Sequence, residues 1–299
     1  MKSPKISVII PTHNRSLYLD YELEQIYRQK NIDFEVIVVN DIVDEDETDL
    51  VVNKYPNLIY IKNNVVQGPS NKHKAGYKIA KGDYFYMPDD DDYLVDEYFF
   101  SKAIKVLDND RSLAFFSGSV ILSYEDEEMN VLKEEKQDLC YYGKIDGRQY
   151  LMNMIKPAST VSTIFRKSTF DALNAVNMIE MSDTSIYLMA LMGGDAFISK
   201  DIVARYRLKA NSLTTTASLP FLYNVLAQKE FFLTIGRNRL INPSLFWAQH
   251  FGATYGILYN SKNSKGSKYG MLLWGLMHNH GSIHMIKFVI VEFFRLMVR

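Results

Sequence analysis

Four consecutive aspartates, Asp89–Asp92, directly follow the apolar run Tyr84–Met87. Adjacent carboxylates repel one another, and this repulsion raises their pKa values unless a cation compensates the charge. Carboxylate oxygens suit Mg²⁺ or Mn²⁺, and Mg²⁺ usually keeps several waters and binds substrate phosphates as well. The aspartate run therefore indicates a divalent-cation site. The alternative is an acidic helix N-terminus, where carboxylates interact favourably with the helix dipole.

Two further aspartates stand at positions that suit chemistry. Asp41 follows the apolar run Phe34–Val39, and Asp183 begins the apolar segment 183–192. Each would be unremarkable as a helix cap. Asp183 would equally serve as a general base if it projected toward a substrate. Sequence spacing alone does not choose between the two roles.

The basic run Lys72–Lys74, with His73 at its centre, lies in a segment with the period of an amphipathic helix, Ser70–Ala80. Its side chains would face either a diphosphate or solvent. Gly76 lies in the same predicted helix, where glycine costs about 1 kcal/mol relative to alanine. This cost predicts that Gly76 is needed for close packing.

The elements that would position these residues alternate along the first 120 residues. The predicted strands are Ile6–Ile10, Phe34–Val39, Leu58–Ile61 and Tyr84–Met87, and the predicted helices are Leu17–Gln29, Thr48–Lys54 and Ser70–Ala80. Strands that are apolar throughout and alternate with helices favour a parallel sheet covered on both faces. Such sheets bind ligands at the carboxyl ends of their strands. The four polar loops that follow the strands are therefore predicted to form one cleft.

The alternation loosens after residue 113. We expect strands at 113–122, 161–165 and 197–208, helices at 148–154 and 183–192, and an acidic loop or hairpin at 124–138. After Ser218 the pattern becomes helical, with a polar break at Asn260–Gly270.

Composition limits the class of protein. Hydrophobic residues make up 47% of the 299 residues, which excludes a wholly disordered or collagen-like chain. Cys140 is the only cysteine, so no intramolecular disulfide can form, as is typical of the reducing cytosol. The apolar run after Lys5 is too short for a signal peptide, and no run reaches the 18 apolar residues of a membrane span.

Charge is distributed unevenly. The net charge of −1 by itself points to no polyanionic partner, and we expect no nucleic acid to bind. Residues 216–299 hold nine Lys or Arg and two acidic residues, a net charge of +7, which leaves −8 for the rest. Such an asymmetry favours an anionic surface as partner of the C-terminal region.

The final segment, 283–299, has its charged and histidine side chains within an arc of about 140° and is apolar elsewhere. So broad an apolar face predicts either packing onto the domain that precedes it or a position in the membrane interface. His278, His280 and His284 lie close together, but no carboxylate near them in sequence completes a metal site.

Taken in order, these motifs resemble those of the family 2 glycosyltransferases, which have the GT-A fold. The segments that carry the resemblance are "SVIIPTHNR", Asp41, "GPSNKHKAGYKIAKGDY", the D-x-D-D-x-L pattern at Asp89–Leu94, Ser182–Asp183 and "YRLKANSLT". The resemblance covers about 215 residues, and the shared order of the motifs makes it specific.

The resemblance implies inverting, metal-assisted transfer from a nucleotide-diphosphate sugar, expected to be a UDP-sugar, to a hydroxyl of a glycan acceptor. The residues it implies are Pro11, Thr12, Asp41 and His73 at the donor, Asp89 and Asp90 near the ribose and diphosphate, Asp91 as ligand of Mn²⁺ or Mg²⁺, and Asp183 as base. Three positions depart from the family pattern. Asn40 replaces an aspartate, Lys72–Lys74 replaces a segment with a donor-contacting arginine, and Lys209 stands where many members have a metal-binding histidine.

We therefore predict a GT-A domain at 1–215, with a donor half at 1–120 and an acceptor half at 121–215, followed by a helical region at 216–299. We expect the enzyme to extend a lipid-linked glycan for a bacterial surface polysaccharide, at the cytoplasmic, inner face of the cell membrane. Two alternatives remain at this point. They are a nucleotidyltransferase of similar α/β fold and a non-catalytic, divalent-cation-binding membrane scaffold.

Overall fold

The computed structural model describes residues 3–41, 47–125, 130–137, 139, 141–153, 157, 159–208, 218–236 and 238–298. Cys140 and Lys209 lie outside the described residues. The chain divides into two compact units. The first comprises Met1–Gly147, Ile155–Asn177 and Met181–Lys209, and the second comprises Arg148–Met154, Met178–Glu180 and Ala210–Arg299. The predicted boundary at residue 215 falls in the segment 209–217, which is not described.

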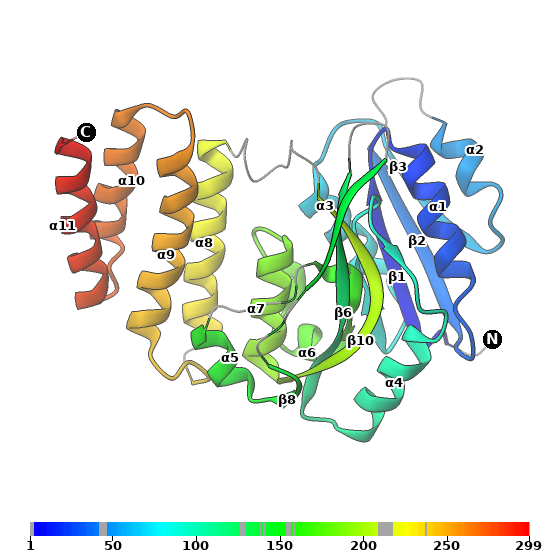
Figure 1. The fold of residues 1–299 in the computed structure, drawn as a ribbon. Helices are drawn as coiled ribbons and strands as arrows, with labels where there is room; N and C mark the ends of the chain where they lie inside the picture. Colours follow the sequence, from blue (N-terminus) through cyan, green and yellow to red (C-terminus); the bar gives the residue numbers. More distant parts are fainter. Residues whose placement is uncertain are drawn as a thin grey trace. The chain divides into compact units, whose positions relative to one another are not determined.

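The first unit is built on one mixed sheet (Figure 1). Its strands are β1 (Ile6–Thr12), β2 (Phe34–Asp41), β3 (Leu58–Asn63), β4 (Tyr84–Tyr86), β5 (Tyr93–Leu94), β6 (Leu113–Glu125), β7 (Val131–Lys136), β8 (Gly143–Ile145), β9 (Thr163–Arg166) and β10 (Asp195–Leu208). Strands β3, β2, β1 and β4 pair in that order and are parallel, as predicted from their apolar sequences.

The sheet continues from β4 with mixed pairing. Strand β9 is antiparallel to both β4 and β6, β6 is parallel to β10, and β5 is antiparallel to β10. Strand β7 pairs antiparallel with β6, so the acidic segment at 124–138 contains one arm of a hairpin. The strand predicted at 161–165 begins only at Thr163, because residues Thr160–Ser162 form a 3-10 turn.

Helices cover the sheet. In the first unit they are α1 (Ser16–Tyr27), α2 (Thr48–Val52), α3 (Pro69–Ile79), α4 (Phe99–Asn109), α6 (Lys167–Ala172) and α7 (Asp183–Gly193), whereas α5 (Gly147–Asn153) belongs to the second unit apart from Gly147. The close packing predicted for Gly76 is confirmed, since a Cβ atom there would lie 2.4 Å from the Cγ2 atom of Ile9 in β1. Glycine thus lets α3 approach the sheet. This brings the residues of α3 close to the carboxyl ends of β1 and β2.

The second unit contains the helices α8 (Leu219–Ile235), α9 (Pro243–Asn260), α10 (Lys265–Met277) and α11 (Ile283–Val298). The predicted polar break at Asn260–Gly270 is too long, because α10 already begins at Lys265. The side chain of Ser264 caps this helix by accepting a hydrogen bond from the Ser267 amide at 3.1 Å. The cap supplies a partner for an otherwise unpaired amide of the first turn and starts a helix in a polar sequence.

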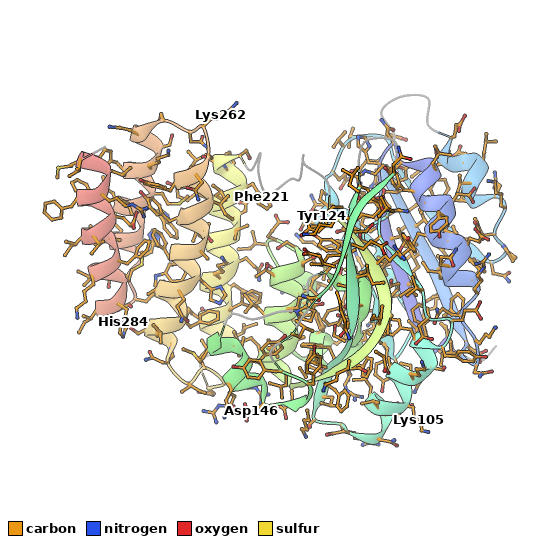
Figure 2. All side chains as sticks on the ribbon, in the orientation of Figure 1. Lys105, Tyr124, Asp146, Phe221, Lys262 and His284 are labelled. Atoms are coloured by element: carbon orange, nitrogen blue, oxygen red, sulfur yellow. The ribbon has the colours of Figure 1, made fainter. Side chains whose placement is uncertain are left out.

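Helix α11 is apolar on two sides. Met285, Val289 and Leu296 are buried in the core of the second unit together with residues of α9 and α10. On the other side, apolar side chains are exposed at Ile283, Ile286, Ile290, Phe294 and Met297. Figure 2 shows His284 at the start of α11 and Lys262, which precedes α10, at the opposite end of these helices. Among the described residues, none of the helices is both long and apolar enough to cross a membrane.

Candidate active site

The carboxyl ends of β1, β2 and β4 bring polar residues together at one edge of the sheet. Thr12 ends β1 and lies opposite Asn40 of β2 in the strand register. The hydroxyl of Thr12 donates a hydrogen bond to Oδ2 of Asp90 at 2.7 Å, which joins the β1 loop to the aspartate run after β4. Pro11 and Thr12 are both buried. The convergence of loops expected from the parallel strands is therefore present for β1 and β4.

Arg15 pairs with two carboxylates of the aspartate run. Its Nη1 atom lies 2.9 Å from Oδ1 of Asp90 and 3.1 Å from Oδ2 of Asp91. Burial raises the pKa of the Asp90 carboxyl, and repulsion from Asp91 adds to this, while Arg15 and the Thr12 hydroxyl oppose the rise. Arg15 was not among the residues expected to act in the site, although it ends the segment "SVIIPTHNR" that carries the resemblance.

Asp92 is almost completely buried, with 1% of its surface exposed. Its two carboxylate oxygens accept hydrogen bonds from the backbone amide of Arg207 at 2.9 Å and from the hydroxyl of Ser159 at 3.0 Å. Burial, followed by repulsion from Asp91 and Asp89, holds the pKa of Asp92 well above its ordinary value. Two hydrogen bonds to other segments indicate that Asp92 anchors the aspartate run rather than facing a ligand.

Arg207 in β10 fixes the same run from the other side. Its Nη1 atom donates to the carbonyl oxygen of Asp91 at 2.7 Å, and its Nε atom lies 3.0 Å from Oε2 of Glu125. The guanidinium also lies over the ring of Tyr93, 4.6 Å from its centroid. Cation–π contact and bidentate pairing are typical of arginine, so lysine would not replace it here.

Asp41 is fully buried at the end of β2. Its carboxylate accepts hydrogen bonds from the side chain of Asn63 at 2.9 Å and from the backbone amides of Gln67 and Gly68 at 3.0 Å each. Burial alone would raise the pKa of Asp41, but these bonds and the nearby Lys72 lower it below its ordinary value. Asp41 therefore binds the loop before α3 and does not cap α2, whose N-cap position belongs to Glu47.

Lys72 and His73 are buried on the inner side of α3, so the solvent-facing alternative is wrong for both. The ammonium of Lys72 donates to the carbonyl of Thr12 at 2.7 Å and lies 3.5 Å from Oδ2 of Asp41. The Nδ1 atom of His73 lies 3.0 Å from the carbonyl oxygen of Met181. Burial lowers the pKa of His73 to about 4, so its ring is neutral at neutral pH.

Asp183 is the first residue of α7, one position after the N-cap residue Ser182. A carboxylate in the first turn is favoured by the helix dipole. Asp183 lies near enough to Asp89 to affect its ionisation. Burial raises the pKa of Asp89 well above its ordinary value, and the charge of Asp183 is the next largest cause. The sequence-predicted base and the aspartate run therefore belong to one electrostatic cluster, which also includes the neighbouring Tyr206.

Glu22 of α1 lies close enough to this cluster to be affected by its charges, and the sequence analysis missed it. It is 1% exposed, and neither carboxylate oxygen has a hydrogen-bond partner among the described residues. Burial, followed by the charges of Asp90 and Asp92, raises its pKa well above the ordinary value. The signal was present, because Glu22 interrupts the apolar face formed by Leu19, Leu23 and Ile26 of α1.

The residues present fit a divalent cation held jointly with a ligand. Among the described residues, no three Asp, Glu, His or Cys side chains are grouped as a complete metal site. Mg²⁺, however, is often held by only one or two carboxylates plus substrate phosphates. Asp89 and Asp91 are half-buried and offer carboxylate oxygens as metal ligands, and the buried carboxyl of the nearby Glu22 has no hydrogen-bond partner among the described residues. This excess of acidic oxygens suits a cation that arrives with a diphosphate.

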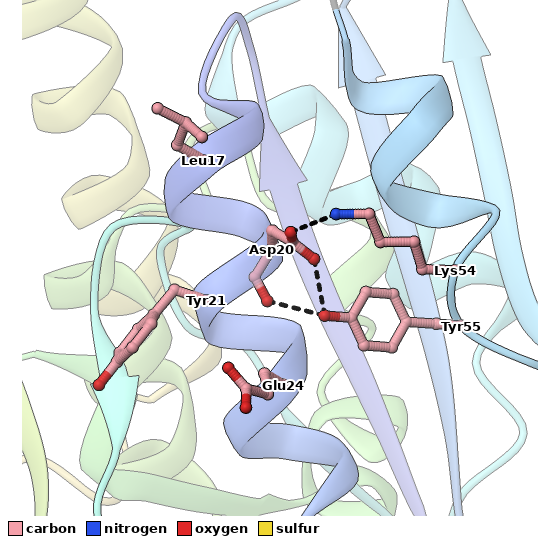
Figure 3. Close-up of a pocket in the computed structure, with 6 residues that line it drawn as sticks. All are labelled: Leu17, Asp20, Tyr21, Glu24, Lys54 and Tyr55. Carbon is pink, nitrogen blue, oxygen red and sulfur yellow. Dashed lines mark hydrogen bonds and ion pairs between the residues drawn. The ribbon is translucent and has the colours of Figure 1, made fainter.

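A hollow of about 370 Å³ on the outer side of α1 is a separate feature (Figure 3). Asp20 lies in it, and its side chain is bound by Lys54 and by the hydroxyl of Tyr55 at 2.8 Å. None of the residues expected to bind donor, metal or acceptor lines this hollow. The hollow is therefore a surface feature of the first unit, and its two acidic residues, Asp20 and Glu24, are already paired with Lys54 and Arg28.

The histidines near the C-terminus do not form a metal site within the described residues. His280 instead lies 2.8 Å from Oε1 of Glu230, a carboxylate from a distant part of the sequence, and His278 stacks on the ring of Trp274. Their spacing in the sequence thus reflects contacts within the second unit.

The family profile described as "Glycosyl transferase family 2" matches residues 7–174, more than half of the chain. The chain belongs to glycosyl transferase family 2. The matched residues include β1, the Asp41 site and the aspartate run. The enzyme is therefore a glycosyltransferase, and the expectation from the sequence motifs is confirmed.

This glycosyltransferase is also similar to individual proteins. The GalNAc(5)-diNAcBac-PP-undecaprenol beta-1,3-glucosyltransferase of Campylobacter jejuni is 33% identical over 96 residues, which is 31% of this chain and 31% of that relative. The chain thus matches less than a third of that relative's length.

Solved structures share the fold over nearly the whole chain. The crystal structure of S. aureus TarS 1-349 with UDP-GlcNAc has a TM-score of 0.61 at 17% identity, covering 96% of this chain and 90% of TarS 1-349. The mannosyltransferase PcManGT from Pyrobaculum calidifontis, solved with GDP-Man and Mn²⁺, has a TM-score of 0.52 at 14% identity, covering 98% and 87%. The likeness confirms the GT-A fold.

Proposed function

We propose that this glycosyltransferase moves a sugar from a UDP-sugar to a hydroxyl of a lipid-linked glycan, with inversion at the anomeric carbon. The observation that carries the proposal is the grouping of Thr12, Asp90, Asp91 and the Asp89–Asp183 pair at the carboxyl edge of the sheet. The carboxyl edge is where open α/β sheets bind ligands. A role in bacterial surface polysaccharide synthesis is supported by the relative whose name specifies an undecaprenol-linked acceptor.

The donor would lie across the ends of β1 and β2. Pro11, Thr12 and Asp41 would bind the nucleoside, with Asp89 and Asp90 beside the ribose and diphosphate. Hydrogen bonds and Lys72 keep Asp41 ionised, which suits an acceptor of hydrogen bonds from a base. UDP is favoured because the structural neighbour TarS binds UDP-GlcNAc. A direct contact of His73 with the donor stays a prediction, since its ring is bound to Met181.

The metal ion would bind at the diphosphate of the donor. Mn²⁺ or Mg²⁺ held by Asp91 would neutralise the charge that develops on the leaving diphosphate. Arg15 pairs with Asp90 and Asp91, and it opposes the rise in the pKa of Asp90 that burial causes. Arg207 holds the backbone of Asp91 in place through its carbonyl oxygen.

Asp183 would act on the acceptor. Its carboxylate takes the proton from the acceptor hydroxyl while that oxygen forms a bond to the anomeric carbon of the sugar. The bond between that carbon and the diphosphate oxygen breaks at the same time, and its electron pair leaves with the nucleoside diphosphate. Attack opposite the leaving group inverts the configuration. His73 supports this role by tying α3 to Met181, two residues before the base.

The second unit would bring the enzyme to its substrate. The exposed apolar side chains of α11 include Ile290 and Phe294, and Lys287 is exposed on the same helix. Apolar burial together with attraction to anionic lipid is how interfacial helices bind. We therefore place the enzyme at the inner face of the cell membrane, where a lipid-linked acceptor would lie.

Transfer by wild-type protein and by Asp91→Ala tests this proposal. Metal catalysis typically supplies several kcal/mol, so the variant should release UDP from its donor at least 10²-fold more slowly. The fold should survive, because loss of the Asp91 charge relieves repulsion on Asp89 and Asp92. The control is Asp201→Ala, which removes an exposed aspartate of β10 that is not part of the aspartate run and should keep full activity. Full activity of Asp91→Ala, or of wild type in excess chelator, would refute the metal role.

A further inference from the structure

A cavity of about 240 Å³ lies within the second unit, between α9 and α11. Its aromatic lining comes from Tyr255 and Tyr259 of α9 and Phe288 of α11. Its charged lining comes from Glu292 and Arg295 of α11, whose side chains form an ion pair at 3.3 Å. None of the residues assigned to catalysis or donor binding lines this cavity. Its combination of aromatic and paired charged groups therefore calls for a separate explanation.

Tyr255 is the most deeply buried of the aromatic residues that line the cavity. Tyr255 is 1% exposed, and its hydroxyl has no hydrogen-bond partner among the described residues. The hydroxyl oxygen is closed off from solvent, so it does not open onto the cavity. What Tyr255 offers to the cavity is therefore aromatic surface.

Two glycines of α9 leave the backbone bare at the cavity wall. Gly252 and Gly256 are one helical turn apart and both line the cavity. A Cβ atom added at Gly256 would meet no atom within 4 Å, so the space beside it is open. Glycine inside a helix destabilises it relative to alanine, because glycine loses more conformational freedom on folding. Open space beside such a glycine fits a role in admitting a ligand rather than a neighbouring helix.

The charges of the cavity select the class of ligand. The Glu292 carboxylate disfavours a phosphate or another anion, although Arg295 lies beside it. The Glu292–Arg295 ion pair also disfavours a hydrocarbon chain, because the pair would lose water without gaining new hydrogen bonds. A neutral sugar ring avoids both penalties, because it carries no negative charge and can form hydrogen bonds with the ion pair. Its C–H face can lie against Tyr259 or Phe288, and its hydroxyls can donate to Glu292 and accept from Arg295.

We propose that this cavity binds a neutral saccharide unit, separately from the donor site. If the proposed function holds, on which this assignment of the saccharide rests, the ligand is a sugar of the glycan that the enzyme extends. The guanidinium of Arg295 lies 4.8 Å from the centre of the Tyr259 ring, which holds the polar and aromatic groups together at the entrance. Binding there would keep a growing glycan attached to the enzyme between transfers.

Filling the cavity gives a direct test. Gly256→Leu places a side chain in the open space and should also favour the helix. Gly270→Leu is the matched control, because Gly270 is likewise a glycine within a helix, has nothing within 4 Å of its Cβ position, and does not line the cavity. The probes are maltose, lactose, cellobiose and N,N′-diacetylchitobiose. Each is titrated into the full-length protein in the millimolar range, and binding is followed by saturation-transfer NMR.

We expect at least one disaccharide to bind saturably to wild type and to Gly270→Leu, with binding at least tenfold weaker in Gly256→Leu. All three proteins should keep a cooperative thermal transition and the thermal shift caused by a UDP-sugar, which reports the donor site separately. Saturating UDP should not displace the disaccharide. Absence of binding by all four probes, equal binding by Gly256→Leu, or displacement by UDP would overturn the proposal. Failure of UDP-sugar binding alone would instead count against the proposed function.

Discussion

Arginines from distant segments hold the aspartate run together. Arg15 follows β1 and pairs with two of its carboxylates, and Arg207 of β10 binds the backbone of Asp91. Without the positive charges of these two arginines, nothing would offset the mutual repulsion of four adjacent carboxylates or the water that they lose on burial. The pairing explains how Asp90 and Asp92 can be buried while Asp91 remains accessible, with 18% of its side chain exposed. The aspartate run therefore does not face solvent as a whole.

The proposed base can be tested with Asp183→Asn. Asparagine keeps the size of aspartate and stays compatible with a helix start, but it cannot take up the acceptor's proton. A positioned base contributes roughly 10²–10⁴-fold, so the rate of transfer should fall by that factor. Donor affinity, measured calorimetrically with a UDP-sugar, should change little. A near wild-type rate would leave Asp183 as a helix-end residue and make Glu180 the next candidate.

His73 predicts a specific pH dependence of stability. Its pKa is about 4 in the folded protein and 6.5 when unperturbed, so the unfolded chain takes up a proton first as pH falls. The stability that this residue contributes is complete above pH 6.5 and is lost as the pH falls from there toward 4. At pH 5 the loss amounts to about 2 kcal/mol.

Urea unfolding at pH 7 and pH 5 measures this effect. His73→Gln removes the titrating group. Between pH 7 and pH 5, its free energy of unfolding should therefore fall by about 2 kcal/mol less than that of wild type. His284→Gln is the control, because His284 is exposed on α11 and its loss should leave the wild-type pH dependence unchanged. Parallel pH dependence of wild type and His73→Gln would contradict the account of a buried, neutral ring.

Only part of the candidate site could be predicted from the types of residue in the sequence. The aspartate run, Asp41 and Asp183 stand out because each follows or begins an apolar element. The partners Arg15, Lys72 and Arg207 do not stand out, because their pairing depends on the spatial arrangement of loops that are far apart in the sequence. Lys72 even appears in a segment that reads equally well as a solvated helix face. Its burial follows from the close approach of α3 at Gly76.

At the level of elements, the sequence predicted the parallel strands β1 to β4. It did not predict how β9, β6, β10 and β5 pair in the mixed half of the sheet. Strands β1 and β2 are apolar throughout, because both faces of the sheet are covered. The neighbours of β9 and β10 depend on long connections, and no local pattern specifies whether such strands run parallel or antiparallel. The start of α10 was missed because Ser, Lys and Gly dominate its first turn, where a serine cap outweighs weak helix propensity.

Helix α11 carries the membrane prediction. Truncating it would expose the core around Met285 and Val289, so substitutions on its outer side are the cleaner test. Ile290→Glu combined with Phe294→Glu replaces two exposed apolar side chains, each worth about 1.5–3 kcal/mol when fully buried. Co-sedimentation with phosphatidylglycerol vesicles should weaken by more than tenfold, and melting should be unchanged.

The control places two glutamates on exposed apolar positions of β7, Val131→Glu with Leu132→Glu. It adds the same charge to the first unit and should bind vesicles like wild type. Binding by wild type should also weaken in high salt, because part of it is electrostatic. Equal sedimentation of the α11 variant, or no binding by wild type at low salt, would exclude a membrane role for this face.

At the scale of the whole molecule, the two units differ in what the sequence reveals about them. The first unit carries the family motifs, and the order of its parallel strands predicts the edge at which we propose that ligands bind. The second unit shows only helical periodicity and a positive charge, so its cavity between α9 and α11 had no counterpart in the sequence analysis. That cavity depends on which helix faces meet, and periodicity alone does not specify this.

The most direct test of the central claim is thermal stabilisation of the full-length protein by nucleotide sugars with and without Mn²⁺. A ligand that binds only the folded state raises its stability by about 2.7 kcal/mol at a hundredfold excess over Kd. The account predicts that a UDP-sugar raises Tm in the presence of Mn²⁺, that chelator removes most of the shift, and that Asp91→Ala abolishes its dependence on metal. A shift with no nucleotide sugar, or one that neither chelator nor Asp91→Ala reduces, would contradict the account.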